Sequence, residues 1–345
     1  MIFSNLTEVR IGGVFKMTKN IALINLGGTI MSMHDPETGR LKAGAMTGDE
    51  LLENANLEHL DVDIDVKEVK SIDSSEMTLE DLRDIAKAIQ NVLDEGVDGI
   101  VLTHGTDTME ETAYMMDLIF DTDTPIVFTG SQLSIEDLGF DGHSNIRDAV
   151  LTASHPDSRG QGVLIVFDQV IIPAHGATKK NSIGLHAFTS YLNTILGVLY
   201  DGKVSYFVNK RRQPHFAIDL SQPFTRDVHV IRMALDFNAN YLNYLVDNGC
   251  DGLVIESLGA GQIFPEAVPA VHKALEKNIP VVVVSRAYTG GVVSLYDGEG
   301  GGAALAQAGC IFDEGRLNGT QARIKLIAML NSEYDSDIAT QWHNF

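Results

Sequence analysis

The chain has 345 residues, of which 44% are hydrophobic, so it can bury a sizeable core and its length suggests two domains. Its formal net charge of −22 would repel the phosphates of nucleic acids, so we expect no nucleic-acid partner. The longest apolar runs, such as residues 279–284, are far shorter than the roughly 20 residues of a membrane-spanning helix, so we expect no membrane partner.

The first residues of the sequence and its two cysteines both favour a cytoplasmic protein. Residues 1–20 contain no apolar signal core. Cys250 and Cys310 adjoin apolar segments far apart, so we expect buried thiols rather than a disulfide. We also interpret Met17 as the natural start and residues 1–16 as translated leader, which amino-terminal sequencing of the native protein would test.

Strand-like and helix-like patterns alternate along the chain, which predicts an α/β protein with an open, mostly parallel sheet flanked by helices. The first predicted helix begins at Thr78, where the sequence to Asp81 is typical of a capping box. In chain order, the predicted elements of this larger part are strand 21–26, strand 62–66, a helix from 78 with apolar positions to 93, strand 99–103 with a helix after it, strand 125–130, helix 145–154 and strand 162–167.

The alternation lapses between residues 205 and 227, where the composition is typical of a linker. Beyond it, strands are predicted at 228–233, 251–256 and 280–285, with a helix at 320–330. We therefore predict three parts: a larger amino-terminal domain at 18–205, a linker at 206–227 and a smaller carboxy-terminal α/β domain at 228–345.

Hydroxyl-bearing residues gather where three predicted strands end. Strand 21–26 runs into Gly27, Gly28 and Thr29, and strand 62–66 leads to Ser74 and Ser75. The carboxyl edge of an open α/β sheet is where small polar ligands bind, so we expect one site built from these ends. The densest segment follows strand 99–103 and reads Thr103-His104-Gly105-Thr106-Asp107-Thr108-Met109-Glu110-Glu111-Thr112-Ala113-Tyr114.

Several familiar sites are poorly supported. Gly259-Ala260-Gly261 follows a strand, but Phe264 stands where a dinucleotide fingerprint requires a third glycine. A phosphate-binding loop, a serine nucleophile elbow and a zinc-binding His-Glu-x-x-His helix are all missing from the sequence. The histidines are scattered, so we expect them to pack or form hydrogen bonds rather than bind a metal.

What remains is hydroxyl chemistry. A threonine is a poor nucleophile and needs a neighbouring proton acceptor. Asp107 follows Thr106 directly, and Lys179, which we expect in a polar loop, could accept the proton if its pKa is lowered. Ser74 and Ser75 could donate hydrogen bonds to a charged ligand.

Each of these residues also has a structural interpretation. Thr29 could cap a helix after a glycine turn, and Thr106 and Asp107 could satisfy turn amides. Ser74 could simply open a helix, and Lys179, beside Lys180, could be a solvated charge.

From residue 21 to near its end, the chain resembles the bacterial-type L-asparaginase and glutaminase-asparaginase family. The segment His104–Ala113 is the most specific match, and the spacing from Gln132 to Asp141 favours the cytoplasmic branch. The other matches are Gly27-Gly28-Thr29-Ile30, Asp73-Ser74-Ser75-Glu76-Met77, Thr178-Lys179, Gly259-Ala260-Gly261, Ser285-Arg286 and Gly319-Thr320-Gln321-Ala322-Arg323.

The resemblance implies hydrolysis of L-asparagine, with L-glutamine as the alternative substrate, to a carboxylate and ammonia without a metal or organic cofactor. On this pattern Thr29 is the acylated nucleophile, Thr106 and Lys179 form a second hydroxyl–base pair, and Asp107 binds the α-amino group of the substrate. The substrate α-carboxylate would be bound by Ser74 and Ser75. The family's two α/β domains assemble into dimers or tetramers, so we expect a homodimer or homotetramer.

Two departures from the family pattern matter. Family members often carry a tyrosine on a loop about a dozen residues after the first threonine, and none occurs here between Thr29 and Tyr114. Arg40 lies in that loop and could bind a carboxylate, but a guanidinium that stays protonated cannot act as a base. The family also supplies an acidic residue from the carboxy-terminal domain across a subunit interface, and Glu299 is the nearest candidate.

These departures keep other functions open. The missing tyrosine is compatible with a non-catalytic sensor that binds asparagine or aspartate in the same pocket. A hydrolase of another small amide would need a wider pocket. A tRNA-dependent amidotransferase subunit would normally add an amino-terminal domain, and the net charge of −22 disfavours tRNA. Asparagine and glutamine differ by one methylene, worth about 1–3 kcal/mol in a fitted pocket, which a sequence does not reveal.

Overall fold

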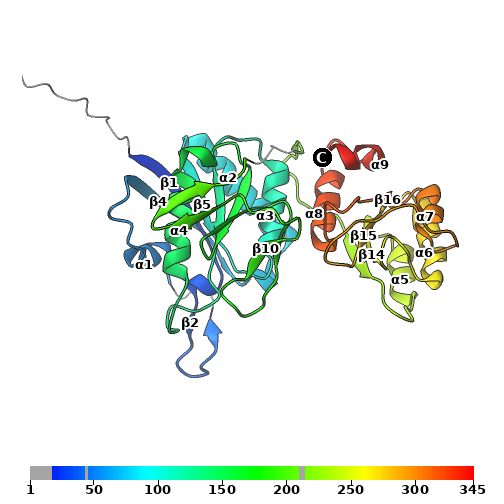
Figure 1. Cartoon of the computed structure of the whole chain (residues 1–345), viewed down its shortest axis with the longest axis horizontal. Helices are drawn as coiled ribbons and strands as arrows, with labels where there is room; N and C mark the ends of the chain where they lie inside the picture. Colours follow the sequence, from blue (N-terminus) through cyan, green and yellow to red (C-terminus); the bar gives the residue numbers. More distant parts are fainter. Residues whose placement is uncertain (1–17, 43–45, 210–213) are drawn as a thin grey trace, which may run out of the picture.

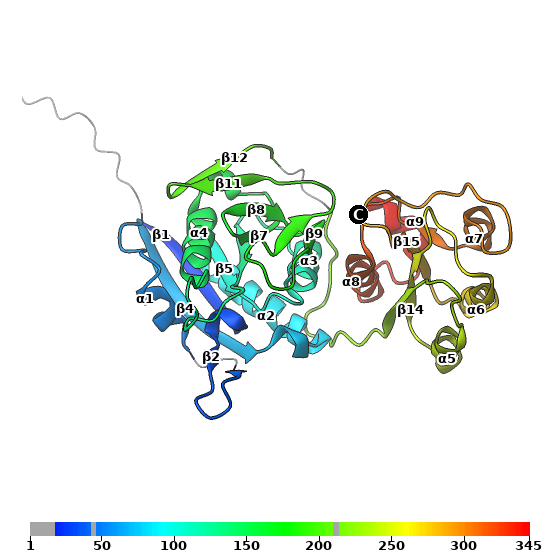
Figure 2. The ribbon, with the colours of Figure 1, turned by 60° about the horizontal axis from the view of Figure 1, so that its bottom comes forward.

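The computed structural model describes residues 18–42, 46–209 and 214–345. The proposed start at Met17 and residues 210–213 of the predicted linker lie outside these ranges. Two sheets stand side by side, each with its own helices, and α8 (Gly319–Leu330) lies between them (Figures 1 and 2). The predicted two-domain α/β architecture is confirmed, whereas the division at 18–205, 206–227 and 228–345 stays a prediction.

The larger sheet has eight strands in the order β12-β11-β8-β7-β6-β5-β1-β4. The run from β7 to β4 is parallel, and the β8, β11 and β12 edge is antiparallel, which sequence alternation did not predict. The strands are β1 (Lys19–Gly27), β4 (Val62–Ile72), β5 (Gly99–Thr103), β6 (Ile126–Thr129), β7 (Val163–Phe167), β8 (Val170–Pro173), β11 (Gly197–Tyr200) and β12 (Lys203–Tyr206).

Helices cover both faces of this sheet. Alternate side chains of β1 point to opposite faces, so that Ala22 and Ile24 join one core and Ile21 and Leu23 the other. The first core includes α2 and α3, and the second includes α1 and α4. A capping box at Thr78 opens α2, as predicted. These helices are α1 (Gly48–Glu53), α2 (Leu79–Glu95), α3 (Met109–Ile119) and α4 (Gly142–Ser154).

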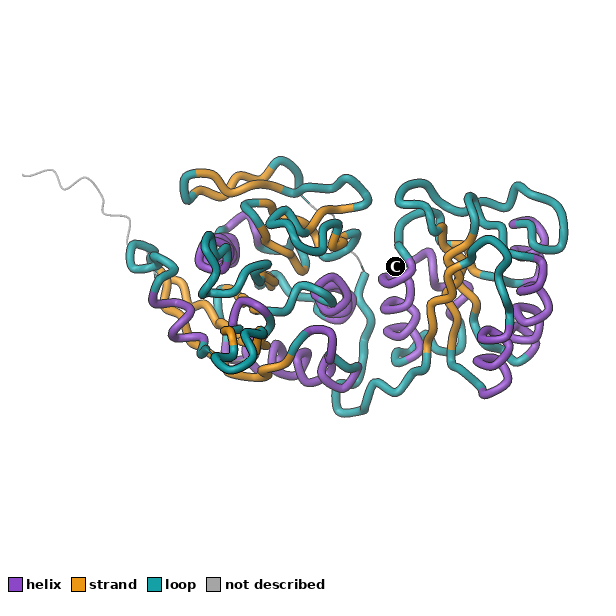
Figure 3. The backbone as a smooth tube through the Cα atoms, turned by 90° about the horizontal axis from the view of Figure 1, so that it is seen from below, coloured by secondary structure: helices purple, strands orange, loops and turns teal. Residues whose placement is uncertain are grey.

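The smaller sheet is parallel, in the order β13-β14-β15-β16. Its face toward the larger domain packs on α8, and this layer is continuous with the α2–α3 core. Its other face packs on α5 and α6, which lie beside the strands in Figure 3. The elements are β13 (Val228–Arg232), α5 (Asn240–Asn248), β14 (Gly252–Ser257), α6 (Val268–Glu276), β15 (Val281–Ser285), α7 (Gly302–Ala308), β16 (Ile311–Phe312) and α9 (Ile338–Gln341).

Two short ladders stand apart from both sheets. β2 (Met33–His34) pairs with β3 (Leu41–Lys42), and β9 (Ala177–Lys179) pairs with β10 (Phe188–Ser190). The 3-10 turns are η1 (Thr29–Met31), η2 (Ser74–Glu76), η3 (Pro156–Ser158), η4 (Pro265–Ala267) and η5 (Trp342–Asn344).

Two simpler features of the described residues are the state of the thiols and the length of the helices. Cys250 and Cys310 are buried and free, as predicted. None of the helices in the described part of the chain is both long enough and apolar enough to cross a membrane.

Candidate functional site

Three neighbouring strand ends meet at the carboxyl edge of the larger sheet. β1 lies between β4 and β5, and the turns after these strands pack on one another through glycine. Gly28 has a positive φ of 84°, and a Cβ there would lie 2.4 Å from the backbone nitrogen of Gly105. A Cβ on Gly105 would in turn lie 2.6 Å from the Ser74 hydroxyl. Glycine is therefore required for the close approach of these turns.

A polar cavity of about 350 Å³ opens at this junction. All six residues singled out from the sequence line it, although they come from four separate segments of the larger domain. Its lining consists of Gly28, Thr29, Ser32, Leu41, Asp73, Ser74, Ser75, Gly105, Thr106, Asp107, Gln132, Lys179 and Ser182.

Lys179 contacts both residues of the Thr106–Asp107 pair. Its Nζ donates hydrogen bonds to Thr106 Oγ1 at 2.7 Å and to Asp107 Oδ1 at 2.7 Å. The Thr106 hydroxyl donates to Gln132 Oε1 at 3.0 Å. The lysine therefore lies in direct contact with a hydroxyl oxygen, the geometry that proton exchange between the two groups requires.

Thr29 begins η1 and does not cap it. The N-cap position is occupied by Gly28, and the turn has no side-chain cap. Within the described part of the chain, the Thr29 hydroxyl forms no hydrogen bond, while the neighbouring Ser32 hydroxyl donates to the Gly28 carbonyl at 2.9 Å. The capping interpretation of Thr29 is thus wrong, and its hydroxyl is available to a ligand in the cavity.

Ser74 and Ser75 open η2 at the end of β4. The Ser74 side chain is buried, and its oxygen accepts a hydrogen bond from the Asp107 backbone nitrogen at 3.1 Å. Thr108 Oγ1 donates to the Ser74 carbonyl at 2.8 Å, which ties the same two turns together again. Ser74 therefore joins the β4 and β5 turns as well as lining the cavity.

Gln132 is a site residue that the sequence reasoning missed. The backbone nitrogens of Gln132 and Leu133 donate to the buried Asp141 carboxylate at 3.0 Å each. The Gln132 side-chain nitrogen donates to the Gly184 carbonyl at 3.3 Å, which orients Oε1 toward Thr106. An amide side chain has neither a charge nor a nucleophilic group. The only signal for Gln132 in the sequence was therefore its spacing to Asp141.

The prediction of a polar loop at Lys179 is wrong, because this residue ends β9. Its backbone nitrogen donates to the Glu110 carboxylate on α3, whose other oxygen lies 3.4 Å from both the Thr178 and the Thr320 hydroxyls. Burial raises the pKa of the Glu110 carboxyl above its usual value. Glu110 thereby links the strand that carries Lys179 to α3.

His104 supports the β5 turn from beneath. Its ring is fully buried, with Nδ1 2.7 Å from the Gly105 carbonyl and Nε2 2.9 Å from the Thr112 hydroxyl. Nδ1 therefore carries the proton and Nε2 accepts from threonine. Burial lowers the pKa of His104 to about 4, so the imidazole is neutral at physiological pH. Among the residues that the structure describes, no group of three or more His, Cys, Asp and Glu side chains could hold a metal ion.

The loop where the family tyrosine is missing forms the β2–β3 hairpin. Leu41 lines the cavity, whereas Arg40 is exposed and does not belong to the lining. Glu299 lies in the smaller domain on a separate surface hollow beside α6 and α7. Within one chain, neither Arg40 nor Glu299 therefore completes the site.

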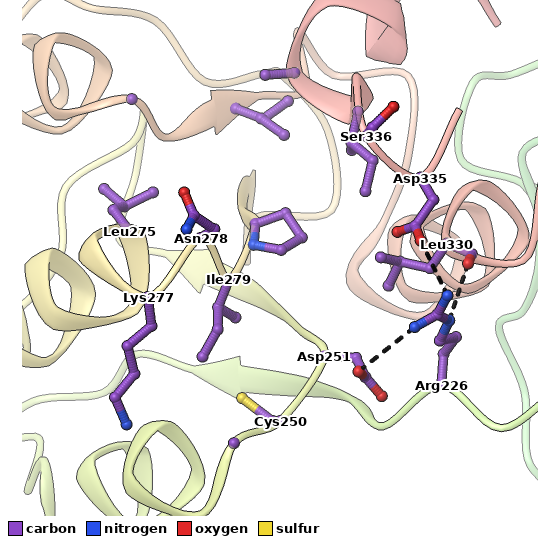
Figure 4. A pocket seen from close by; sticks show the side chains of 16 residues that line it. Arg226, Cys250, Asp251, Leu275, Lys277, Asn278, Ile279, Leu330, Asp335 and Ser336 are labelled. Atoms are coloured by element: carbon purple, nitrogen blue, oxygen red, sulfur yellow. Dashed lines mark hydrogen bonds and ion pairs between the residues drawn. The ribbon is translucent and has the colours of Figure 1, made fainter. Parts of the chain in front are cut away.

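A second cavity, of about 620 Å³, lies at the amino ends of the smaller sheet's strands (Figure 4). Its basic groups are engaged by carboxylates and backbone carbonyls. Arg226 donates to the Leu330 carbonyl at 2.9 Å and to Asp335 at 3.0 Å, and it lies 3.8 Å from Asp251. Lys277 donates to the Val246 carbonyl at 2.6 Å, and burial raises the pKa of the nearby Cys250 thiol.

Comparison with known proteins gives consistent matches along the chain. Residues 20–212 match the family "Asparaginase, N-terminal", and residues 227–342 match the "Glutaminase/Asparaginase C-terminal domain". An L-asparaginase from Bacillus licheniformis is 37% identical over 319 residues, covering 92% of this chain and 97% of that protein. L-asparaginase 2 from Escherichia coli (strain K12) is 31% identical, covering 94% of this chain and 92% of that protein.

Among solved structures, a probable cytoplasmic L-asparaginase from Campylobacter jejuni is similar with a TM-score of 0.83 and 28% sequence identity. The match covers 95% of this chain and all of that one. A probable periplasmic L-asparaginase from Haemophilus influenzae, 29% identical and matched over 94% of this chain and 92% of that protein, is also among the relatives.

Proposed function

The chain belongs to the asparaginase family of hydrolases, and on that basis we propose that it converts L-asparagine to L-aspartate and ammonia through a threonine nucleophile. The single observation that carries this proposal is the Lys179–Thr106 contact of 2.7 Å in a cavity also lined by the unengaged hydroxyl of Thr29. Neither a metal nor an organic cofactor takes part in the proposed reaction.

The proposed reaction has two halves. Thr29 Oγ1 attacks the side-chain amide carbon of asparagine, its proton passes to the departing nitrogen, and ammonia leaves an aspartyl ester on the threonine. Water then attacks the ester carbon, and the ester oxygen returns to Thr29 as its hydroxyl. Thr106 and Lys179 relay the protons that these two steps move, since the lysine already contacts the Thr106 oxygen.

The two charged groups of the substrate would bind at the same carboxyl edge of the larger sheet. One oxygen of Asp107 is bound by Lys179, and this largely exposed carboxylate offers its other oxygen to the substrate α-ammonium group. The Ser74 and Ser75 hydroxyls would donate to the α-carboxylate. The cavity of about 350 Å³ suits a small amino acid better than a bulky amide.

A sensor that binds asparagine without hydrolysing it is the second candidate. One observation favours it: the cavity wall formed by the β2–β3 hairpin presents Leu41, which cannot exchange a proton, where the family often supplies a phenol. The activating base for Thr29 would then be missing from the chain itself. Binding without turnover would distinguish this candidate from the enzyme.

We further propose a cytoplasmic homodimer or homotetramer. The solved relative from Campylobacter jejuni is named as cytoplasmic. Leu235 and Leu295, in loops beyond the carboxyl ends of β13 and β15, are 92% and 74% exposed, as expected of side chains that a second copy covers. Sedimentation of the purified protein would test the assembly, and a monomer at working concentrations would contradict it.

The experiment that tests the proposed function is ammonia release by the purified protein from L-asparagine and L-glutamine in parallel. We expect turnover of asparagine and its loss in Thr106→Ala. Release of ammonia from neither amide, together with calorimetric binding of L-aspartate, would contradict the enzyme and favour the sensor. The ratio of kcat/KM for the two amides would measure the selectivity.

A further inference from the structure

The motif Gly319-Thr320-Gln321-Ala322-Arg323 contributes no residue to the cavity lining, yet it packs against the site, where Thr320 lies 3.4 Å from Glu110. It forms the first turns of α8, the helix between the two domains. Gln321 is fully buried there, and the side chain of Asn318 caps the helix by accepting from the Gln321 backbone nitrogen at 2.8 Å. The Gln321 side chain therefore projects from a fixed helix end.

All polar atoms of this side chain are used by the larger domain. Oε1 accepts from the Gly176 backbone nitrogen at 2.9 Å, and Nε2 donates to the Ala174 and Ala177 carbonyls at 2.9 and 3.2 Å. The Tyr191 hydroxyl, which donates to the Arg316 carbonyl at 2.7 Å, lies 3.2 Å from Oε1. One glutamine thus holds three backbone groups of a single turn.

That turn leads directly to Lys179. It joins β8 to β9, and Lys179 lies two residues after Ala177. Among the described residues, β9 pairs with β10 alone, in a two-stranded ladder that is separate from the main sheet. Because the sheet does not fix β9, its position depends on the contacts at its start, from Gln321, and at its end, from Glu110.

We propose that Gln321 is a positioning residue for Lys179, so that the smaller domain sets the distance between the lysine and the Thr106 hydroxyl. This inference rests on the proposed function in that Lys179 is taken as the proton-exchanging base. Gln321 does not touch the cavity lining and acts through the turn at 174–177. The interface between the domains is then part of the catalytic apparatus of a single chain.

Arg323, two residues further along α8, provides a matched control. Its guanidinium lies 3.8 Å from Glu111 on α3, and its Nε donates to the Val228 carbonyl at 2.8 Å. It therefore belongs to the same contact between the domains, but it bonds to no group of the 174–179 segment. Gln321→Met and Arg323→Met both remove polar contacts at this interface, and only the first frees the turn before Lys179.

The test combines steady-state kinetics with hydrogen exchange on the full-length variants. For Gln321→Met we expect kcat for L-asparagine to fall about 10²-fold with KM changed by less than about threefold, because small displacements of a reacting group are that costly. Backbone amides of the 174–179 segment should exchange faster. Arg323→Met should keep kcat within about threefold and leave that exchange unchanged.

Gln321→Glu adds a signature that a merely structural role would not produce. Its carboxylate cannot donate to the Ala174 and Ala177 carbonyls, whereas the protonated acid can donate to one of them. The ratio of its kcat to that of the wild type should therefore rise as the pH falls. This variant also keeps the test valid if circular dichroism shows that Gln321→Met does not fold.

Several outcomes would overturn the inference: a folded Gln321→Met protein with wild-type kcat, unchanged exchange in the 174–179 segment, or an equal loss of kcat in Arg323→Met. If the wild type releases no ammonia from either amide, the proposed function fails instead. The exchange comparison then still decides whether Gln321 holds the segment that carries Lys179.

Discussion

Two of the cavities of this protein, the one beside Arg226 and the one beside Lys179, differ in a property that their volumes do not indicate. The larger, of about 620 Å³, lies at the amino edge of the smaller sheet, and the smaller, of about 350 Å³, lies at the carboxyl edge of the larger sheet. In the larger cavity Arg226 is bound by two carboxylates and a carbonyl. In the smaller, Lys179 contacts a hydroxyl, and the Thr29 hydroxyl forms no hydrogen bond with the residues that the structure describes.

The direction of the chain explains this difference. At the amino edge, α5, α6 and α7 end, and their last carbonyls present partial negative charge, which basic side chains such as Lys277 satisfy. At the carboxyl edge, chains leave the strands through tight turns that carry hydroxyls and enter helices at their positive ends. Groups left unengaged, rather than empty volume, therefore indicate where chemistry occurs.

The largest effect should come from Lys179. We expect Lys179→Met to lower kcat for L-asparagine by about 10²–10⁴-fold, the usual contribution of a positioned proton-exchanging group. The neighbouring Lys180 is exposed and supplies a control, so Lys180→Met should stay within about threefold of wild type. Steady-state ammonia release measures both. Equal activity of the two variants would remove Lys179 from the mechanism.

The next effect is on the pH dependence of the unfolding free energy, through the buried His104 below the site. The pKa of His104 is lowered from 6.5 to about 4, so between these values the unfolded chain binds more protons than the folded one, and stability falls as the pH falls. The full contribution is about 3 kcal/mol, lost between pH 6.5 and 4. His104→Asn should flatten this slope in urea unfolding, whereas a substitution of the exposed His59 to Asn should keep it. Identical slopes in His104→Asn and wild type would contradict the prediction.

The smallest effect should come from the larger cavity. Arg226→Met removes one hydrogen bond and two partly exposed ion pairs, so we expect unfolding free energy to fall by about 1–2 kcal/mol. The kcat for L-asparagine should stay within about threefold of wild type. A loss of turnover in a folded Arg226→Met protein would show that this cavity takes part in the reaction and would undo the comparison.

The sequence was most informative where local pattern decides structure. Apolar runs predicted the central parallel strands, and the capping box at Thr78 predicted the start of α2. Helix α4 begins at Gly142, earlier than predicted. No local signal marks this start, because glycine is a poor helix former and the adjacent Asp141 binds the Gln132 and Leu133 amides instead of capping the helix. The antiparallel edge strands depend on distant pairing that no local pattern specifies.

In the site, too, only residues that are recognisable from the sequence itself could be predicted. Residues with distinctive chemistry, such as Thr29, Thr106 and Lys179, stood out before the fold was known, and the fold brings them to one cavity. Gln132 and Gln321 did not stand out, because an amide acts only through the partners that the fold gives it. The β9 ladder at Lys179 was also missed, since three residues are too few for a periodic pattern.

The most direct test of Thr29 as the nucleophile is to find the covalent intermediate. The protein would be quenched in acid during turnover of isotope-labelled L-asparagine, and the labelled peptide would be located by mass spectrometry, with Thr29→Ala as the control. We predict an aspartyl ester on Thr29 and no label or turnover in the variant. Label on Thr106 instead, or full turnover by Thr29→Ala, would contradict it.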